Sequence, residues 1–115
     1  MHLREIIKIL DAEILTENDD SELDIEVHTA CGSDMMSDVL AYVKDQGLLL
    51  TGLCNPQVVR TAEMVDIVVI AFVRGKRPDE MTLQLAKQKG IILLGTNEKM
   101  YQACGKLYNA GLGSR

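Results

Sequence analysis

With 115 residues, the chain has room for one domain with a modest core, which we expect to span residues 1–115. Apolar residues make up 47% of it, but three Tyr, one Phe and no Trp argue against a pocket that stacks bases on aromatic rings. The net charge is −5, and it is unevenly spread: residues 1–66 carry 14 acidic against 4 basic residues, and residues 67–115 carry 3 against 8. Phosphates repel an acidic chain, and the basic part lacks interleaved aromatics or a recognition helix, so nucleic acid is not an expected partner.

The sequence also indicates the compartment. No apolar run approaches the roughly 20 residues of a membrane span, and no leader pattern opens the chain, so we expect a cytoplasmic protein with no membrane partner. The three cysteines, Cys31, Cys54 and Cys104, form no C-x-x-C pair. We therefore predict reduced thiols and no metal site.

The first third of the chain predicts a helix and two strands. Apolar residues at helical spacing predict a short helix over Leu3–Leu10, and Ala12–Thr16 is predicted to pair as a strand. Residues 17–22 are polar and acidic, which favours an exposed loop. Ile25–His28 alternates apolar and polar residues, as a half-exposed strand would.

A second helix is predicted next, from Ser33, whose hydroxyl can cap it, to about Lys44, with Gly47 closing it. Three repeats of one pattern then follow, each an apolar run, a polar turn and an amphipathic helix. Strands that are apolar on both faces and alternate with helices predict an α/β fold with a mixed, mainly parallel β-sheet flanked by helices. The runs and their turns are Leu48–Leu50 with Thr51-Gly52, Ile67–Val73 with Arg74–Arg77, and Ile91–Leu94 with Gly95-Thr96-Asn97.

Each of the three later helices has a predicted start. Asn55-Pro56 places a capping residue before a proline at the first helical position. Pro78 with Asp79-Glu80 repeats that device, and Asn97 with Glu98 is predicted to start a last helix that runs towards Gly111.

Parallel sheets place their ligands beyond the carboxyl ends of the strands, so the turns are the candidate site. The Arg74–Arg77 turn sets three cations between a strand end and a helix N-terminus, which suits a nucleotide or a phosphorylated metabolite. The alternative is that Gly75 makes the turn while the cations are solvated or pair with acids of the N-terminal half. If their strands are parallel neighbours, Thr51-Gly52 and Thr96-Asn97 emerge on the same edge, where Ser33-Asp34 could join them to line a pocket. The alternative is that these polar residues serve only capping and turn geometry. The candidate ligand-binding residues are Thr51, Gly52, Asn55, Arg74, Gly75, Lys76, Arg77, Thr96 and Asn97.

Catalytic residues are not expected. A thiol nucleophile needs a base, and the one arrangement on offer is Cys31 three residues after His28, with no evident third group to orient the imidazole. The carboxylates of residues 19–26 lack the spacing and glycine of a calcium loop and favour a solvated loop. A small hydrolase or transferase built on Cys31 and His28 remains the least favoured hypothesis.

Three segments resemble the DRTGG domain: Leu48–Arg60, Val69–Met81 and Ile91–Thr96. The resemblance extends over roughly residues 3–112 and implies a fold similar to the N-terminal domain of HPr kinase/phosphorylase. It implies a regulatory or assembly domain without kinase activity, since no G-x-x-x-x-G-K-[ST] occurs, and most simply a homodimer. The family's Asp-Arg pair would fall near Gly52-Leu53 and its Thr-Gly-Gly near Val73–Gly75, of which only Gly75 is kept.

Together these observations predict a homodimeric, non-catalytic regulatory module that needs no cofactor and senses a nucleotide or phosphorylated metabolite at its strand-end loops. The alternative is a pure protein-interaction or scaffold subunit without a small ligand. The last helix offers a surface for either a second copy or a partner protein, because apolar residues recur along it at helical spacing. That stripe comprises Met100, Tyr101, Cys104, Leu107 and Tyr108.

Overall fold

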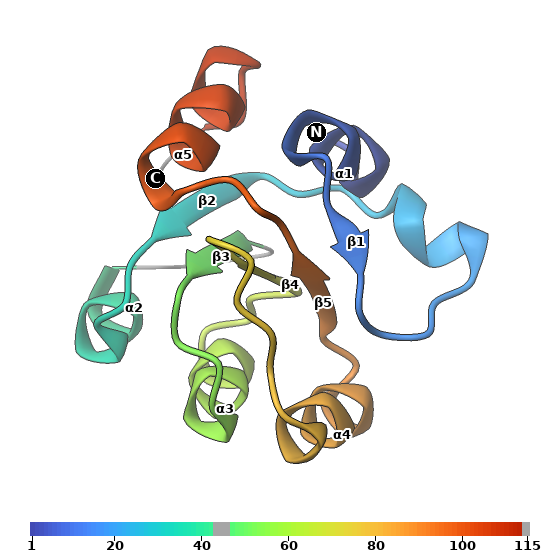
Figure 1. Ribbon diagram of the computed structural model, residues 1–115, viewed down its shortest axis with the longest axis vertical. Helices are drawn as coiled ribbons and strands as arrows, with labels where there is room; N and C mark the ends of the chain where they lie inside the picture. The colour runs from blue at the N-terminus through green and yellow to red at the C-terminus, as the bar shows by residue number, and fades with distance from the viewer. Residues whose placement is uncertain (43–46, 114–115) are drawn as a thin grey trace.

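A computed structural model of the chain describes residues 1–42 and 47–113 (Figure 1). A central sheet has helices on both faces, with α1 and α5 on one side and α2, α3 and α4 on the other (Figure 1). In chain order the elements are α1 (Leu3–Leu10), β1 (Glu13–Ile14), the 3-10 helix η1 (Asp20–Asp24), β2 (Thr29–Gly32), α2 (Met36–Tyr42), β3 (Gly47–Thr51), α3 (Pro56–Met64), β4 (Val69–Phe72), α4 (Glu80–Lys89), β5 (Ile92–Gly95) and α5 (Met100–Asn109).

The strand order is β1-β5-β4-β3-β2. The strands β2 to β5 are parallel to their neighbours, and β1 pairs antiparallel with β5 at the other edge. This confirms the mixed, mainly parallel α/β sheet flanked by helices. Because the residues paired across the sheet include Thr51, Phe72 and Gly95, the strands β3, β4 and β5 end at one level, and their following turns leave the sheet at one edge.

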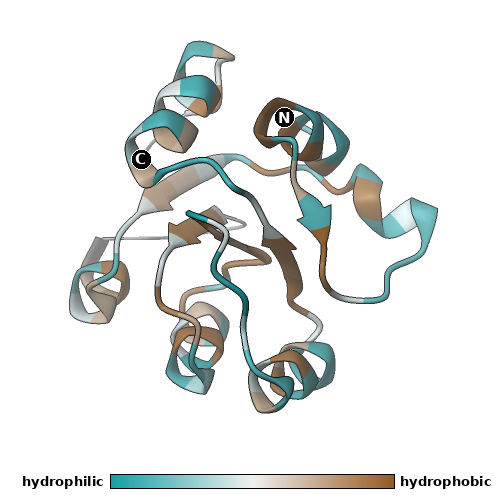
Figure 2. Cartoon of the chain, in the orientation of Figure 1, coloured by the Kyte–Doolittle hydropathy of each residue, from teal (hydrophilic) through white to brown (hydrophobic). Residues whose placement is uncertain are grey.

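The strands are apolar on both faces because each face of the sheet is covered by helices and forms its own hydrophobic core. Along β3, Leu48 and Leu50 pack under α1 and α5, while Leu49 packs towards α2 and α3. Figure 2 shows the same division, with hydrophobic strands inside and helices that are hydrophilic on the side turned away from the sheet. Among the residues that the structure describes, no helix is both long and apolar enough to cross a membrane.

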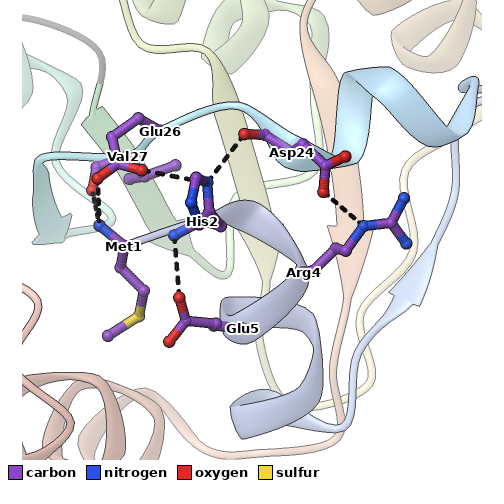
Figure 3. A network of polar contacts seen from close by, with 7 residues as sticks. All are labelled: Met1, His2, Arg4, Glu5, Asp24, Glu26 and Val27. Atoms are coloured by element: carbon purple, nitrogen blue, oxygen red, sulfur yellow. Dashed lines mark hydrogen bonds and ion pairs between the residues drawn. The ribbon is translucent and has the colours of Figure 1, made fainter.

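A polar network ties α1 to the segment that precedes β2 (Figure 3). The Met1 ammonium donates to the Val27 carbonyl at 3.0 Å, and His2 Nδ1 lies 2.9 Å from the Asp24 carbonyl oxygen. Arg4 Nε donates to Asp24 Oδ1 at 2.6 Å. These bonds hold the segment along α1, outside the sheet.

The predicted strand at Ile25–His28 is therefore wrong. That segment contributes a single bridge, His2 with Glu26, and the strand is the next four residues, Thr29–Gly32. The alternation of apolar and polar residues over 25–28 does correspond to alternating burial, because Val27 is buried while its neighbour His28 is exposed. The alternation reflects contact with α1.

Other boundaries were predicted with mixed success. The helices α1 and α3 begin where expected, at Leu3 and Pro56. The acidic loop of residues 17–22 is mostly exposed but its end winds into η1. Helix α2 begins at Met36, Lys44 lies outside the described residues, and Gly47 opens β3 instead of closing a helix.

Two further helix starts differ from the prediction. Asp79 caps α4, so Pro78 lies before the cap instead of at the first helical position. Lys99 is the N-cap residue of α5, which begins at Met100, so Asn97 does not cap that helix.

Candidate functional site

The turn after β4 is the most strongly charged of the strand-end turns. Arg74 and Gly75 both have positive φ, at 59° and 70°, and the Lys76 N–H donates to the Val73 carbonyl at 3.2 Å, as in a type I′ turn. The N–H of Arg74 donates to the Glu98 carbonyl and that of Gly75 to the Thr96 carbonyl, each at 2.8 Å. These three amides are therefore already used.

The N–H groups of Arg74, Gly75 and Lys76 are consequently not available to an anion. At the N-terminus of α4, the Asp79 carboxylate accepts the Thr82 N–H at 2.8 Å. The attraction for an anion in this turn therefore comes mainly from its side chains.

The three cations of this turn point in different directions. Arg77 pairs with Glu13 of β1 at 2.7 Å, and its guanidinium covers Gly95, where an added Cβ would collide with it. Arg77 thus follows the alternative interpretation, pairing with an acid of the N-terminal half. Arg74 and Lys76 form no ion pair with any residue that the structure describes.

Arg74 instead reaches the turn after β3. Its Nη2 atom would lie 2.8 Å from a Cβ added to Gly52, and the Asp34 carboxylate flanks the same point, with Oδ1 at 3.5 Å. Lys76 lies close enough to act electrostatically on both Asp34 and Cys54. The Arg74 guanidinium and the Asp34 carboxylate therefore meet over Gly52, and Lys76 adds its positive charge to the same region.

The Asp34 side chain is held in place by β3. Its Oδ1 accepts the Gly52 N–H at 2.7 Å and the Thr51 hydroxyl at 3.0 Å. The Gly52 N–H bond has the largest effect on the pKa of Asp34. Together with the Thr51 hydroxyl and the charges of Arg74 and Lys76, it outweighs partial burial and holds that pKa below its usual range. Asp34 is therefore an ionised, fixed acceptor beside two cations.

Asp34 was not among the nine candidate residues, although the sequence allowed the Ser33-Asp34 turn to join the converging strand-end turns. With β2 expected four residues too early, the sequence placed Ser33 and Asp34 at the start of a helix. In the structure they directly follow β2, and the Ser33 hydroxyl caps the turn by accepting the Met35 N–H at 3.0 Å. The usable signal was a carboxylate immediately after a strand that carries only small residues.

The remaining predicted residues have local structural roles. Asn55 caps α3 by accepting the Val58 N–H at 3.3 Å. Thr96 is 3% exposed and donates its hydroxyl to the Leu10 carbonyl at 2.7 Å, so it joins β5 to α1. Asn97 lies against Gly75, its Oδ1 3.1 Å from where a Cβ would be. Thr51 belongs to the candidate site through Asp34.

The cysteines do not gather into one group. Cys31 packs against the core under α2 and α3, whereas Cys104 packs against the core under α1 and α5. Burial raises the pKa of Cys31, Cys54 and Cys104 alike. A thiol nucleophile needs a lowered pKa, so the hypothesis of catalysis by Cys31 and His28 gains no support.

A second feature is an apolar groove between α5 and the β2 edge of the sheet, with a volume of about 730 Å³. Gly113 is among the lining residues, and its carbonyl accepts the Ala30 N–H at 3.2 Å. The apolar stripe predicted on α5 divides here, because Leu107 is buried while Tyr101 and Tyr108 are 87% and 73% exposed. The two tyrosines line the groove.

Comparison with known proteins supplies a family and a fold. The family model described as the DRTGG domain matches residues 5–110. A similar solved structure is that of the CBS and DRTGG domains of the regulatory region of Clostridium perfringens pyrophosphatase, complexed with its activator diadenosine tetraphosphate. The two chains are 14% identical with a TM-score of 0.73, over 92% of this chain and 45% of that one. No relative was found among curated proteins.

Proposed function

This chain belongs to the DRTGG domain family, and we propose that it is a non-catalytic regulatory module that binds a nucleotide or another phosphorylated small molecule at its strand ends. The observation that carries the proposal is the Arg74 guanidinium, which reaches over Gly52 at the end of β3, while neither Arg74 nor Lys76 of the same turn forms an ion pair with a described residue. A guanidinium and an ammonium from one turn suit phosphate oxygens, which accept bidentate bonds from the first and bind the second as a point charge.

The proposed regulatory role is supported by the similarity of this chain to a domain from a regulatory region. The similar pyrophosphatase structure contains a DRTGG domain within a regulatory region and was solved with a nucleotide activator. This chain spans less than half of that one, so the comparison supports a regulatory role without identifying the ligand or the protein regulated.

We propose further that the module acts in the cytoplasm as a homodimer, with a second copy docked on the α5 groove. Tyr101 and Tyr108 stand exposed on its rim, and Lys106, the one charged side chain among the described residues that line it, is paired with Glu98 at 2.8 Å. A patch that meets its own copy across a two-fold axis must not repel itself. The described residues of this surface carry no uncompensated charge, in a molecule of net charge −5.

The dimer proposal is tested by sedimentation of Tyr101→Glu/Tyr108→Glu. Charges introduced at this rim should convert a dimer into a folded monomer. The control is Met64→Glu/Met81→Glu, which alters side chains that are 70% and 69% exposed on α3 and α4 and should leave the mass unchanged. A monomeric parent protein, or dissociation by the control alone, would reject this interface.

The scaffold alternative is favoured by the same groove. An exposed apolar surface of this size also suits a partner protein, and a module of that kind would need no small ligand. The two functions differ in what happens at Arg74 and Lys76, so the decisive experiment concerns ligand binding.

A thermal-shift screen provides that test. The melting temperature is measured with nucleotides, with dinucleotides including diadenosine tetraphosphate, and with sugar phosphates. A ligand of the native state stabilises it by about 2.7 kcal/mol at a hundredfold excess over its dissociation constant. The shift should disappear in Arg74→Ala/Lys76→Ala. It should persist in Arg60→Ala/Lys87→Ala, which removes one exposed arginine and one exposed lysine elsewhere. No shift with any compound would favour the scaffold.

A further inference from the structure

The two oxygens of the Asp34 carboxylate are in different situations. Oδ1 accepts both hydrogen bonds that fix the side chain, from the Gly52 N–H and the Thr51 hydroxyl. Oδ2 accepts none from the residues that the structure describes, and the residue as a whole is exposed. One oxygen therefore positions the group, and the other is left as an oriented acceptor.

Gly52 keeps that acceptor next to a cation. A Cβ at this position would lie 2.8 Å from Arg74 Nη2 and 3.6 Å from Asp34 Oδ2, so any side chain here would displace the guanidinium. Carboxylate and guanidinium thus approach the same point from the ends of two strands, yet they form no ion pair with each other. Both remain available to a third group.

A ligand made only of phosphate does not suit this arrangement. Arg74 and Lys76 would attract it, but the negative charge of Asp34 would oppose it at close range. A ligand that carries a hydroxyl donor beside its phosphate would satisfy both halves. The lowered pKa of Asp34 keeps the carboxylate ionised at neutral pH, so that it accepts and does not donate.

We infer that the strand-end site recognises a ribose phosphate, free or within a nucleotide, with Asp34 accepting a ribose hydroxyl and Arg74 and Lys76 holding the phosphate. This inference rests on the proposed function and deepens it, because it assigns specificity to a residue that carries no positive charge. Asp34 selects the sugar, and the two cations supply the attraction.

Asp34→Asn separates the two contributions. Asparagine keeps an oxygen that can accept the Gly52 and Thr51 bonds, so the fold should be preserved. It replaces the free Oδ2 acceptor by an NH2 donor and removes the negative charge. Asp38→Asn is the matched control, since it removes one exposed carboxylate from the neighbouring helix α2.

The experiment measures calorimetric affinities of four probes: ATP, 2′,3′-dideoxy-ATP, ribose 5-phosphate and inorganic tripolyphosphate. In the parent protein, ATP should bind at least about tenfold more tightly than its dideoxy analogue, the effect of one hydrogen bond to a charged group. Asp34→Asn should remove that preference, weakening ATP while tightening tripolyphosphate. Asp38→Asn should change neither. Binding of ribose 5-phosphate with the same dependence on Asp34 would show that the sugar phosphate alone is recognised.

Opposite changes in the affinities for ATP and tripolyphosphate distinguish this inference from the broader proposal of phosphate binding. If every probe binds through Arg74 and Lys76 but Asp34→Asn affects ATP and tripolyphosphate alike, sugar recognition is overturned and phosphate binding stands. If no probe binds the parent protein, both are overturned.

Discussion

Thr51 is the last residue of β3 and Thr96 is the first residue after β5, and the two threonines have different roles. Both are buried, and each hydroxyl accepts the N–H of the residue two positions later at 3.1 Å. The difference lies in what each hydroxyl donates to. Thr96 donates to the buried carbonyl of Leu10, whereas Thr51 donates to the exposed carboxylate of Asp34.

The same local motif therefore stabilises the fold at one turn and orients a charged group at the other. The local sequence cannot distinguish the two, because the distinguishing partner comes from a distant segment. Each of the following predictions tests this division between a structural turn and a site-forming turn.

Thr96→Val should give the largest loss of stability. It leaves the buried Leu10 carbonyl and the Glu98 N–H without their partner, and an unsatisfied buried polar group costs about 1–3 kcal/mol. Urea unfolding would show the loss, and Thr96→Ser, which keeps the hydroxyl, should recover most of it. A loss as large in Thr96→Ser would assign the effect to packing of the methyl group instead.

Thr51→Val should cost less stability but impair binding. It leaves the Leu53 N–H without its partner, just as Thr96→Val does for the Glu98 N–H, but its other partner Asp34 is exposed and water can replace that bond. We therefore expect a smaller loss than in Thr96→Val. The freed carboxylate should weaken ATP binding several-fold in the titration described above. A stability loss equal to that of Thr96→Val would contradict the division between the two turns.

Gly52→Ala should affect the site with little effect on the fold. The added Cβ meets the flexible end of Arg74, which can move aside, so we expect unfolding to change within about 0.5 kcal/mol. Phosphate affinity should fall as the guanidinium is displaced from Asp34. Gly105→Ala is the control, since an added Cβ there meets nothing within 4 Å.

The smallest expected effect is a change in the free energy of unfolding at acidic pH. Because the pKa of Asp34 is lowered by folding, its contribution to stability is present above its unfolded pKa, about 3.9, and is lost as pH falls through the folded value. The difference in unfolding free energy between the parent and Asp34→Asn should be constant above about pH 5 and shrink below about pH 4. A difference that grows on acidification would show that the carboxylate is unfavourably placed.

Most of the fold could be predicted because its signals are local and strong. Long apolar runs marked β3, β4 and β5, and Asn55-Pro56 marked the start of α3. The strand β2 was misplaced because it carries small residues for a reason that only packing shows. A Cβ on Gly32 would lie 2.7 Å from Cys104 Sγ, so α5 leaves no room for a larger side chain there.

The sequence predicted which edge of the sheet carries the candidate site, but not which side chains meet there. Parallel strands fix which edge carries the turns, and the sequence supplies the cations. Where each cationic side chain points depends on partners that are distant in the sequence: Glu13 for Arg77, and the Asp34 region for Arg74. Local sequence gives no access to such contacts, and the same holds for the hydroxyl of Thr96.

The most direct test of the account is a chemical-shift titration of the ¹⁵N-labelled protein with ATP. We predict that the largest amide shifts fall in the turns after β2, β3 and β4, at residues 33–35, 51–53 and 74–76, and that they vanish in Arg74→Ala/Lys76→Ala. Shifts confined to the α5 groove, or the same map in the double variant, would contradict a strand-end ligand site.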